Sequence, residues 1–303
     1  MTDDHPFISI LVRARNDEVL IERTLSGIFA QRADFPFEVV VCDDASTDGT
    51  RAVAAKFPVR FAERPVGAYK PGRTLNSLIR DAKGEIVVFN NSDSVPLDDV
   101  WLSTLVKPIL DDPGHRVFSF ANQLPRSDAQ MLVRKDNERA FGDGRVQATW
   151  RFFFSLASSA TWRQNLIEVP FDEDIQYSED VEWTWRNSRR RENPVKVVYC
   201  PDARVEHSHN YAIRELARRF HGEGVADKVI FGDSPSLLRE IASAVRETLR
   251  DWAYLATRPR GWGEIPYAPV RRIVQRLAHW RGTRDFSRRD AVAQRDQGKS
   301  KQE

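Results

Sequence analysis

Short apolar runs alternate with helical patterns over the first 120 residues. Runs of the kind that form buried strands occur at 8–12, 37–42, 85–89 and 117–120. Apolar residues recur at helical spacing between them, over 19–29 and again over 75–82. Strands that alternate with helices are typical of an α/β domain around a mostly parallel sheet. We therefore expect a Rossmann-like sheet flanked by helices, with one more strand at 196–199.

Beyond His209 the pattern becomes helical. A first amphipathic stripe consists of Leu237, Ile241, Val245, Leu249 and Trp252. A second stripe consists of Val270, Ile273, Val274, Leu277 and Trp280. The Pro and Gly residues of 258–266 predict a loop between the two helices. We expect an α/β domain over 1–210, a C-terminal helical extension over 211–285 and a disordered tail over 286–303.

Composition indicates a cytoplasmic protein. No window of the 303 residues approaches 18 consecutive apolar positions, and the start of the chain is acidic, so neither a membrane span nor a signal peptide is expected. The two cysteines, Cys42 and Cys200, lie in apolar strand-like runs, which favours buried free thiols over a disulfide or a metal pair.

The net charge of +2 conceals an asymmetry. Residues 211–303 carry 19 basic and 12 acidic side chains, whereas residues 1–210 carry 27 basic and 32 acidic ones. Nucleic-acid binding is not expected, because the body is acidic and the basic part lacks a known module. The two basic helices could lie on the inner face of the plasma membrane through residues 236–285. Alternatively, their apolar stripes pack on the body of the protein or on a second copy in a homo-oligomer.

Carboxylates end the second apolar run. Asp43 and Asp44 follow the strand directly, and in open α/β sheets ligands bind at the carboxyl ends of strands. Such acids can accept hydrogen bonds from a nucleotide base or a ribose. Asp48 and Gly49 fit a turn that caps the next helix, but two adjacent acids exceed what a turn needs.

Three further groups could carry chemistry. Asn91, Ser92 and Asp93 follow the strand at 85–89, and Asp93 could hold a divalent cation through oxygen. His207 and His209 follow another apolar run, and a histidine could join Asp93 as a ligand, with Mn²⁺ preferred over Mg²⁺.

Glu179 and Asp180 begin a predicted helix. A carboxylate there could remove a proton from an acceptor hydroxyl. Acids at a helix start also simply complement the helix dipole, so this pair alone does not decide between the two interpretations.

In combination and in this order, these stretches resemble glycosyltransferase family 2, whose members have the GT-A fold. The carboxylates Asp43 and Asp44 match the family's uridine- or thymidine-contacting acids, and Asn91-Ser92-Asp93 lies at its Asp-X-Asp metal motif. Glu179-Asp180 matches its Glu-Asp motif, in which the Asp is the base of an inverting transferase.

The resemblance also implies roles for neighbouring residues. Arg13 and Asn16, after the first strand, and Arg73 would contact the nucleotide sugar, while His207 and His209 would bind metal or diphosphate. Asn91 replaces the first Asp of Asp-X-Asp, which removes one negative charge beside the expected Mn²⁺ or Mg²⁺.

Finer detail is similar to the bacterial rhamnosyltransferase branch of the family. The similar stretches are Gly72–Asn76, Asn122–Ala129 and His207–Tyr211. That branch implies a dTDP-L-rhamnose donor and a glycan or lipid-linked acceptor for the cell envelope, with a UDP-linked or other donor as the alternative. A fold that binds glycan or nucleotide but has lost turnover is a second alternative. A dinucleotide oxidoreductase is disfavoured, because residues 13–16 replace the Gly-rich turn that it requires.

Overall fold

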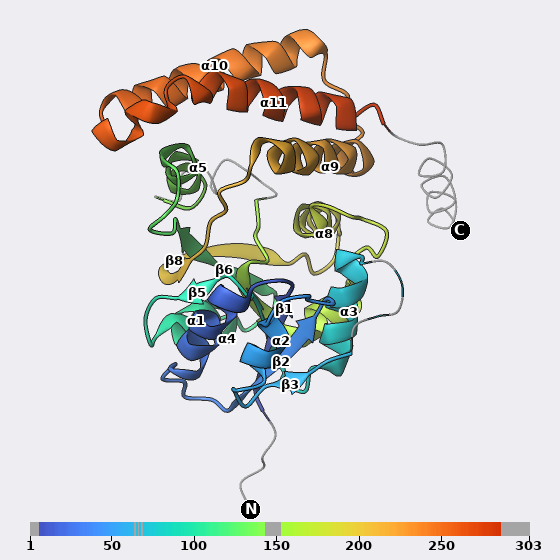
Figure 1. The fold of residues 1–303 in the computed structure, drawn as a ribbon. Coiled ribbons are helices and arrows are strands. Elements are labelled where there is room, and N and C mark those ends of the chain that lie inside the picture. The colour runs from blue at the N-terminus through green and yellow to red at the C-terminus, as the bar shows by residue number, and fades with distance from the viewer. Residues whose placement is uncertain (1–5, 64, 66, 68, 143–152, 286–303) are drawn as a thin grey trace, which may run out of the picture. The chain divides into compact units, whose positions relative to one another are not determined.

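The computed structural model describes residues 6–63, 65, 67, 69–142 and 153–285 (Figure 1). The described residues form two compact units. The first unit draws on 1–129, 136–175 and 179–208, and the second on 130–135, 176–178 and 209–303. The domain boundary predicted at residue 210 stays a prediction, since the second unit also includes short earlier segments. The predicted disordered tail lies outside the described residues.

The first unit is built on an eight-stranded mixed sheet, counted over the described residues, in the order β3-β2-β1-β4-β7-β6-β8-β5. Its strands are β1 Ile8–Ala14, β2 Phe37–Asp43, β3 Arg60–Phe61, β4 Ile86–Asn91, β5 Val95–Pro96, β6 Val117–Leu124, β7 Ser158–Trp162 and β8 Lys196–Glu206. Strands β3, β2, β1 and β4 run parallel, and β6 and β8 also pair in parallel. Strand β7 is antiparallel to both β4 and β6, and β5 is antiparallel to β8. The predicted mostly parallel α/β sheet is thus confirmed.

Both faces of this sheet are buried. Ile10 and Val12 of β1 belong to one core cluster, with Trp101, whereas Leu11 between them belongs to the other, with Leu75 and Phe118. Successive side chains of a strand point to opposite faces, so a strand covered on both sides is apolar at most positions. This explains why the strands appear in the sequence as continuous apolar runs.

Helices connect the strands of the first unit. They are α1 Glu18–Phe29, α2 Thr50–Ala54, α3 Pro71–Asp81, α4 Trp101–Leu110, α7 Arg163–Glu168 and α8 Glu179–Ser188, while α5 Met131–Phe141 is divided between the two units. Helix α3 begins with Pro71, whose fixed φ suits a first helical turn and whose missing N–H is not needed there. Gly72 follows because a Cβ at this position would lie 2.0 Å from the carbonyl oxygen of Asp172.

The second unit is mainly helical. It contains α9 Ile213–Phe231, α10 Leu237–Ala256, the 3-10 helix η1 Pro259–Glu264 and α11 Tyr267–Gly282. Helix α9 ends at Gly232, whose φ of 74° is left-handed, and Ser236 caps α10 by accepting a hydrogen bond from the Arg239 N–H. Helices α10 and α11 lie side by side as a hairpin (Figure 1).

Glycines allow α9 and α11 to approach closely. A Cβ at Gly224 of α9 would lie 2.2 Å from the carbonyl oxygen of His279 on α11. A Cβ at Gly282 of α11 would lie 2.0 Å from the carbonyl oxygen of His221 on α9. The backbones therefore pack against each other at two points where only hydrogen fits.

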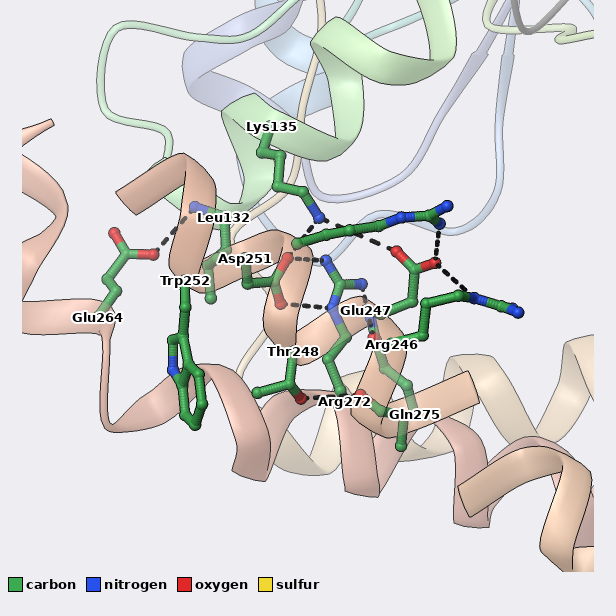
Figure 2. A network of polar contacts seen from close by, with 12 residues as sticks. Leu132, Lys135, Arg246, Glu247, Thr248, Asp251, Trp252, Glu264, Arg272 and Gln275 are labelled. Atoms are coloured by element: carbon green, nitrogen blue, oxygen red, sulfur yellow. Dashed lines mark hydrogen bonds and ion pairs between the residues drawn. The ribbon is translucent and has the colours of Figure 1, made fainter. Parts of the chain in front are cut away.

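A buried network of charges joins α10 to α11 and to Lys135 (Figure 2). Asp251 is fully buried, and Arg272 donates to both of its oxygens, at 2.7 and 2.8 Å. Lys135 donates to the same carboxylate at 2.5 Å. Such a network is sensitive to loss of any member, because the remaining charges stay buried without a counterion.

The structure gives two findings for the C-terminal helices, and the second corrects a prediction. The side chains of the first stripe are 38–57% exposed. The polar face of α10 is buried instead, since the charge network gives it partners. The segment predicted as a loop at 258–266 contains helix η1, whose turns accommodate Pro259 at the start.

The remaining composition-based expectations concern membrane spans and thiols. None of the helices in the described ranges has the length and apolarity needed to cross a bilayer. Cys42 and Cys200 are buried free thiols, as predicted, and burial raises the pKa of Cys200 to about 11.

Candidate active site

Three neighbouring strands end at one edge of the sheet. The register places Arg13 of β1 opposite Asn91 of β4, and Ala14 of β1 opposite Asp43 of β2. Because these strands are parallel, their carboxyl ends lie side by side and the polar residues that follow them converge. This edge therefore collects most of the residues that the sequence singled out.

The acids after β2 are tied into the edge. Asp44 is 7% exposed and forms an ion pair of 3.0 Å with Arg15, while Ser46 donates to Asp43 at 2.5 Å. Asn16 links the two strand-end loops: its N–H donates to Ser46 Oγ at 3.0 Å, and its side-chain oxygen accepts from the Thr47 N–H at 2.8 Å. Asn16 thus holds the loop that carries the acids.

Left-handed backbone occurs in both of these loops. Asn16 and Ala45 each have a φ of 53°. Asparagine tolerates this region, but an alanine there is strained by about 1 kcal/mol. Asp48 behaves as the predicted turn residue, because it accepts from the N–H groups of Thr50 and Glu18.

Arg13 connects the middle of the edge to helix α8. Its guanidinium donates to Glu179 at 3.1 Å, to the Asn91 side-chain oxygen at 3.4 Å and to the Tyr69 hydroxyl at 3.5 Å. Burial alone would lower the pKa of Arg13, but Tyr69 and Glu179 outweigh that effect and raise it. Arg13 is therefore a permanent positive charge among the predicted site residues.

Asp180 has a strongly altered acidity. Loss of hydration raises its pKa, the adjacent Glu179 carboxylate raises it further, and the total reaches about 7 despite opposition from the Val181 N–H and from Arg13. A carboxyl group with a pKa near neutrality is half in the basic form at cellular pH. The start of α8 thus has the acidity that a proton acceptor needs.

A second polar pair lies beyond the end of β4. His207 Nε2 is 3.5 Å from an oxygen of Asp93, and both side chains are 12% exposed. His207 Nδ1 is 2.8 Å from the side-chain oxygen of Gln123, whose amide nitrogen donates to Ser155. An amide oxygen only accepts, so Nδ1 carries a proton in this contact, and Nε2 is the ring atom that faces Asp93.

This arrangement fits a cation. A histidine ligand commonly donates its other ring N–H to a carbonyl oxygen, as His207 does to Gln123. Asp93 and His207, both of the first unit, could each offer one ligand atom, and His209 follows His207 by two residues at the start of the second unit. A carboxylate and imidazoles suit Mn²⁺ better than Mg²⁺.

The other predicted residues have different surroundings. Ser92 donates a short hydrogen bond to Asp17 and so fixes the turn that carries Asp93. Arg73, on α3, lies 3.5 Å from Glu173, and both side chains are about two-fifths exposed. The side-chain oxygen of Asn91 accepts from Arg13, a contact that an amide can make as a carboxylate would.

Sequence reasoning missed Tyr69 and Gln123. Tyr69 lies in a connection without periodic pattern, and its hydroxyl faces Arg13, 56 residues away. Gln123 lies inside an expected signature, but its contact with His207 joins residues 84 apart. Alternation along the strand was the available signal, because Gln123 is a polar residue at a buried position of β6, between the less buried Asn122 and Leu124.

Comparison with known proteins identifies the family of the chain. Residues 9–159 match Glycosyl transferase family 2. The chain belongs to glycosyltransferase family 2. This stretch includes Asp43, Asp44 and Asp93, but not Asp180 or His207.

Two curated relatives come from O-antigen assembly. The chain is 24% identical over 208 residues to the O-antigen chain rhamnosyltransferase WbaN of Salmonella anatum. The matched region covers 65% of this chain and 64% of that protein. It is 25% identical over 255 residues to the O-antigen chain rhamnosyltransferase RfbN of Salmonella typhimurium. Here the matched region covers 80% of this chain and 78% of that protein. The chain thus spans slightly less than two thirds of the length of WbaN.

Solved structures show the same GT-A fold. The mannosyltransferase PcManGT from Pyrobaculum calidifontis, in complex with GDP-Man and Mn²⁺, has a TM-score of 0.59 at 20% identity, over 90% of this chain and 87% of that one. Glucosyl-3-phosphoglycerate synthase from Mycobacterium tuberculosis, in complex with Mn²⁺, UDP and glucosyl-3-phosphoglycerate, has a TM-score of 0.53 at 21% identity, over 74% and 79%. At such identities the likeness concerns the fold, and the predicted GT-A architecture is confirmed.

Proposed function

We propose that the protein is an inverting glycosyltransferase that moves a sugar from a nucleotide diphosphate to an acceptor hydroxyl. The observation that carries the proposal is Asp180, whose pKa of about 7 occurs next to an Arg13-linked cluster at the carboxyl edge of the sheet. The family match adds that this edge belongs to a family 2 glycosyltransferase. Such an enzyme needs residues that bind the nucleotide sugar, a proton acceptor and a carboxylate for the cation. This edge of the sheet offers residues for each of these tasks.

Asp180 takes the acceptor's proton in this proposal. Its anionic form accepts the proton while the acceptor oxygen attacks the anomeric carbon from the face opposite the departing diphosphate, so the anomeric configuration inverts. Glu179 stays paired with Arg13 and keeps a negative charge beside Asp180, which holds the pKa of Asp180 high. General bases of this kind contribute about 10²–10⁴-fold to the rate.

The acids after β2 bind the nucleoside part of the donor. Asp43 and Asp44 supply acceptors for base N–H or ribose hydroxyl groups, and Asn16 keeps their loop in place. Arg73, which is partly exposed beside Glu173, offers a positive charge to the nucleotide or its diphosphate. Ser92 holds the neighbouring turn through Asp17.

Asp93 and His207 would hold a divalent cation, Mn²⁺ or Mg²⁺, with His209, two residues after His207, as a further candidate ligand. The fit rests on the Nδ1 proton of His207, which Gln123 fixes, and on the adjacent Asp93 carboxylate. When bound, the cation supplies positive charge that offsets the charge on the diphosphate. Asn91 leaves the set with one carboxylate fewer than the Asp-X-Asp pattern.

The donor we favour is dTDP-L-rhamnose, and the acceptor we favour is a glycan or lipid-linked glycan that is destined for the cell envelope. Support comes from WbaN and RfbN, both O-antigen chain rhamnosyltransferases that resemble this chain over most of its length. The alternative is a donor with another nucleotide or sugar, since PcManGT, which has a similar fold, was solved with GDP-Man. The reaction would take place in the cytoplasm, at the inner face of the plasma membrane.

A thermal-shift panel tests donor and metal together. The intact chain is heated with dTDP-L-rhamnose, UDP-glucose or GDP-mannose, in Mn²⁺, Mg²⁺ or chelator. A ligand at 100 times its Kd stabilises the folded state by about 2.7 kcal/mol. We expect one donor to raise Tm in Mn²⁺ and to lose most of that effect in chelator; no response to any nucleotide sugar would refute the proposal.

The variant Asp180→Asn separates binding from transfer. We expect it to retain the donor-induced rise in Tm and to lose about 10²–10⁴-fold in transfer rate. A control variant, Asp202→Asn, changes an exposed carboxylate on β8 and should leave both readouts unchanged. Transfer by Asp180→Asn at more than about a tenth of the wild-type rate would reject Asp180 as the base. Donor binding without any transfer by the wild type would favour a protein that has lost turnover.

A further inference from the structure

The outward face of helix α10 is apolar. Leu238 is 78% exposed, and Ile241, Val245, Leu249 and Trp252 follow it at intervals of three or four residues with 42–57% exposure. Side chains at this spacing share one face of a helix. Helix α10 therefore presents a continuous apolar stripe to its surroundings.

The acidic residues of the same helix point the other way. Glu240 and Glu247 are each 5% exposed and Asp251 is fully buried, where Arg272 and Lys135 bind it (Figure 2). A surface helix of a globular protein normally buries its apolar face and exposes its charged one. Helix α10 does the reverse, so ordinary core packing does not explain its stripe.

The stripe continues into the turn between α10 and α11. The indole N–H of Trp252 donates to the Ile265 carbonyl at 3.0 Å, and that of Trp262 donates to the Ala256 carbonyl at 3.4 Å. Trp252 and Trp262 are 42% and 57% exposed, and Ile265 is 36% exposed. With their N–H groups bound to the backbone, both indoles offer apolar ring surface outward.

Helix α11 adds apolar positions and the segment adds positive charge. Val270 and Ile273 are each 50% exposed. Residues 237–284, all of which the structure describes, expose no carboxylate, since their fourth acid, Glu264, is half-buried and accepts from the Met131 and Leu132 N–H groups. Their exposed arginines are Arg239, Arg246, Arg250, Arg260, Arg281 and Arg284.

We propose that the hairpin of α10, η1 and α11 is a membrane-docking surface for an anionic bilayer. A bilayer interface takes up leucine, isoleucine and tryptophan side chains, while anionic headgroups pair with arginines beside them. The stripe and the arginines occupy the same segment, and its acids are buried out of reach of the headgroups.

A second copy of the chain fits this surface less well. Arg246 and Arg250 pair with the buried Glu247. Two such surfaces in contact would still bring Arg239, Arg260, Arg281 and Arg284 of each copy together, with no exposed carboxylate of residues 237–284 to pair them. Like charges that are juxtaposed at an interface cost several kcal/mol, whereas anionic lipid neutralises them. Charge complementarity thus selects the bilayer.

The test is co-flotation of the intact chain with vesicles. Vesicles of 70% phosphatidylcholine and 30% phosphatidylglycerol are compared with pure phosphatidylcholine, at about 0.05 M and about 0.5 M salt. We expect binding to the anionic vesicles at low salt, a large loss at high salt where the Debye length is only a few ångströms, and little binding to neutral vesicles. Absence of binding to anionic vesicles at low salt overturns the proposal.

Exposed side chains can be changed with little risk to folding. Leu238→Ser with Leu249→Ser removes part of the stripe, and Arg239→Gln with Arg260→Gln removes charge without touching the buried network. Each arginine near an anionic surface contributes about a fivefold factor, so the arginine pair should weaken binding roughly 20- to 30-fold. The serine pair should reduce binding to both vesicle types.

Matched controls lie in the first unit. Val19→Ser with Ile167→Ser changes two exposed apolar residues, and Arg80→Gln with Arg191→Gln changes two exposed arginines. These variants should bind anionic vesicles like the wild type. Equal loss of vesicle binding in the test and control pairs would overturn the proposal. The proposal would also be overturned if the wild type bound no vesicles but self-associated, and Leu238→Ser abolished that self-association. Donor-induced stabilisation is measured in solution without vesicles. A chain that binds no vesicles would therefore refute the membrane proposal without refuting the proposed transferase reaction.

Discussion

Replacing Asp180 by asparagine should make the protein more stable at alkaline pH while it destroys catalysis. The folded-state pKa of Asp180 is about 7, against an ordinary value of 3.8. The difference is roughly three units, and each unit corresponds to about 1.4 kcal/mol, so about 4 kcal/mol is the upper limit. Because the side chain keeps partial contact with water, we expect about 1–2 kcal/mol.

The direction follows from proton binding. Between pH 4 and 7 the folded state holds a proton on Asp180 that the unfolded state releases, so the wild type loses stability as the pH rises. Above pH 7 the full destabilisation is present. An asparagine does not titrate and can still accept from the Val181 N–H through its amide oxygen. The stability difference between variant and wild type should therefore be near zero at pH 4 and largest at pH 8.

Denaturant and thermal unfolding at pH 4.5, 6, 7 and 8 measure this difference. We expect Asp180→Asn to melt about 2–8 °C above the wild type at pH 8 and close to it at pH 4.5. Asp202→Asn is the matched control and should show no difference that grows with pH. A difference that is constant over this range, or a variant less stable than the wild type at pH 8, would show that Asp180 is not held at high pKa in the folded state.

Three further predictions concern the site and the second unit. His207→Ala should abolish the Mn²⁺-dependent part of donor stabilisation but not nucleotide binding in chelator, as thermal shift would show; an unchanged Mn²⁺ effect would place the cation elsewhere. Asp251→Ala should lower the free energy of unfolding by about 3–5 kcal/mol, because Arg272 and Lys135 remain buried without a counterion. Gly224→Ala should cost about 1–3 kcal/mol through overlap with the His279 carbonyl, whereas Gly263→Ala, with nothing within 4 Å, should be neutral in the same denaturant titration.

The sheet of the first unit was predictable because burial on both faces leaves a simple signal. Strands such as β1 and β4 are largely apolar, and polar residues occur toward their carboxyl ends, Arg13 in β1 and Asn90 and Asn91 in β4. The predicted strands all form, and they extend further toward their carboxyl ends than predicted. Polar residues such as Asn91 continue β4, and the apolar criterion stopped before them.

Site residues were predictable where the type of a residue and its position after a strand or at a helix start indicate a chemical role. Asp93, Asp180 and His207 stand out because a polar group directly follows an apolar run or begins a helix. Tyr69 and Gln123 act on other side chains across 56 and 84 residues, and a sequence alone does not show such pairs.

Helix α10 shows a different limit of sequence patterns. Its periodicity correctly predicted which side chains share a face, but not which face is buried. Glu240, Glu247 and Asp251 also share a face, and their partners decide its burial. Lys135 lies 116 residues from Asp251, so the reversal is visible only in three dimensions.

The charge network of the α10–α11 hairpin has a consequence for calorimetry and solvent denaturation. Unfolding of apolar surface produces the heat-capacity increment, so a hairpin held largely by ions should contribute less of it per residue than the hydrocarbon-filled sheet. Guanidinium chloride is a salt and weakens ion pairs as well as hydrophobic contacts, whereas urea is uncharged. The hairpin should therefore unfold early in guanidinium chloride relative to the sheet, and the two events should lie closer together in urea.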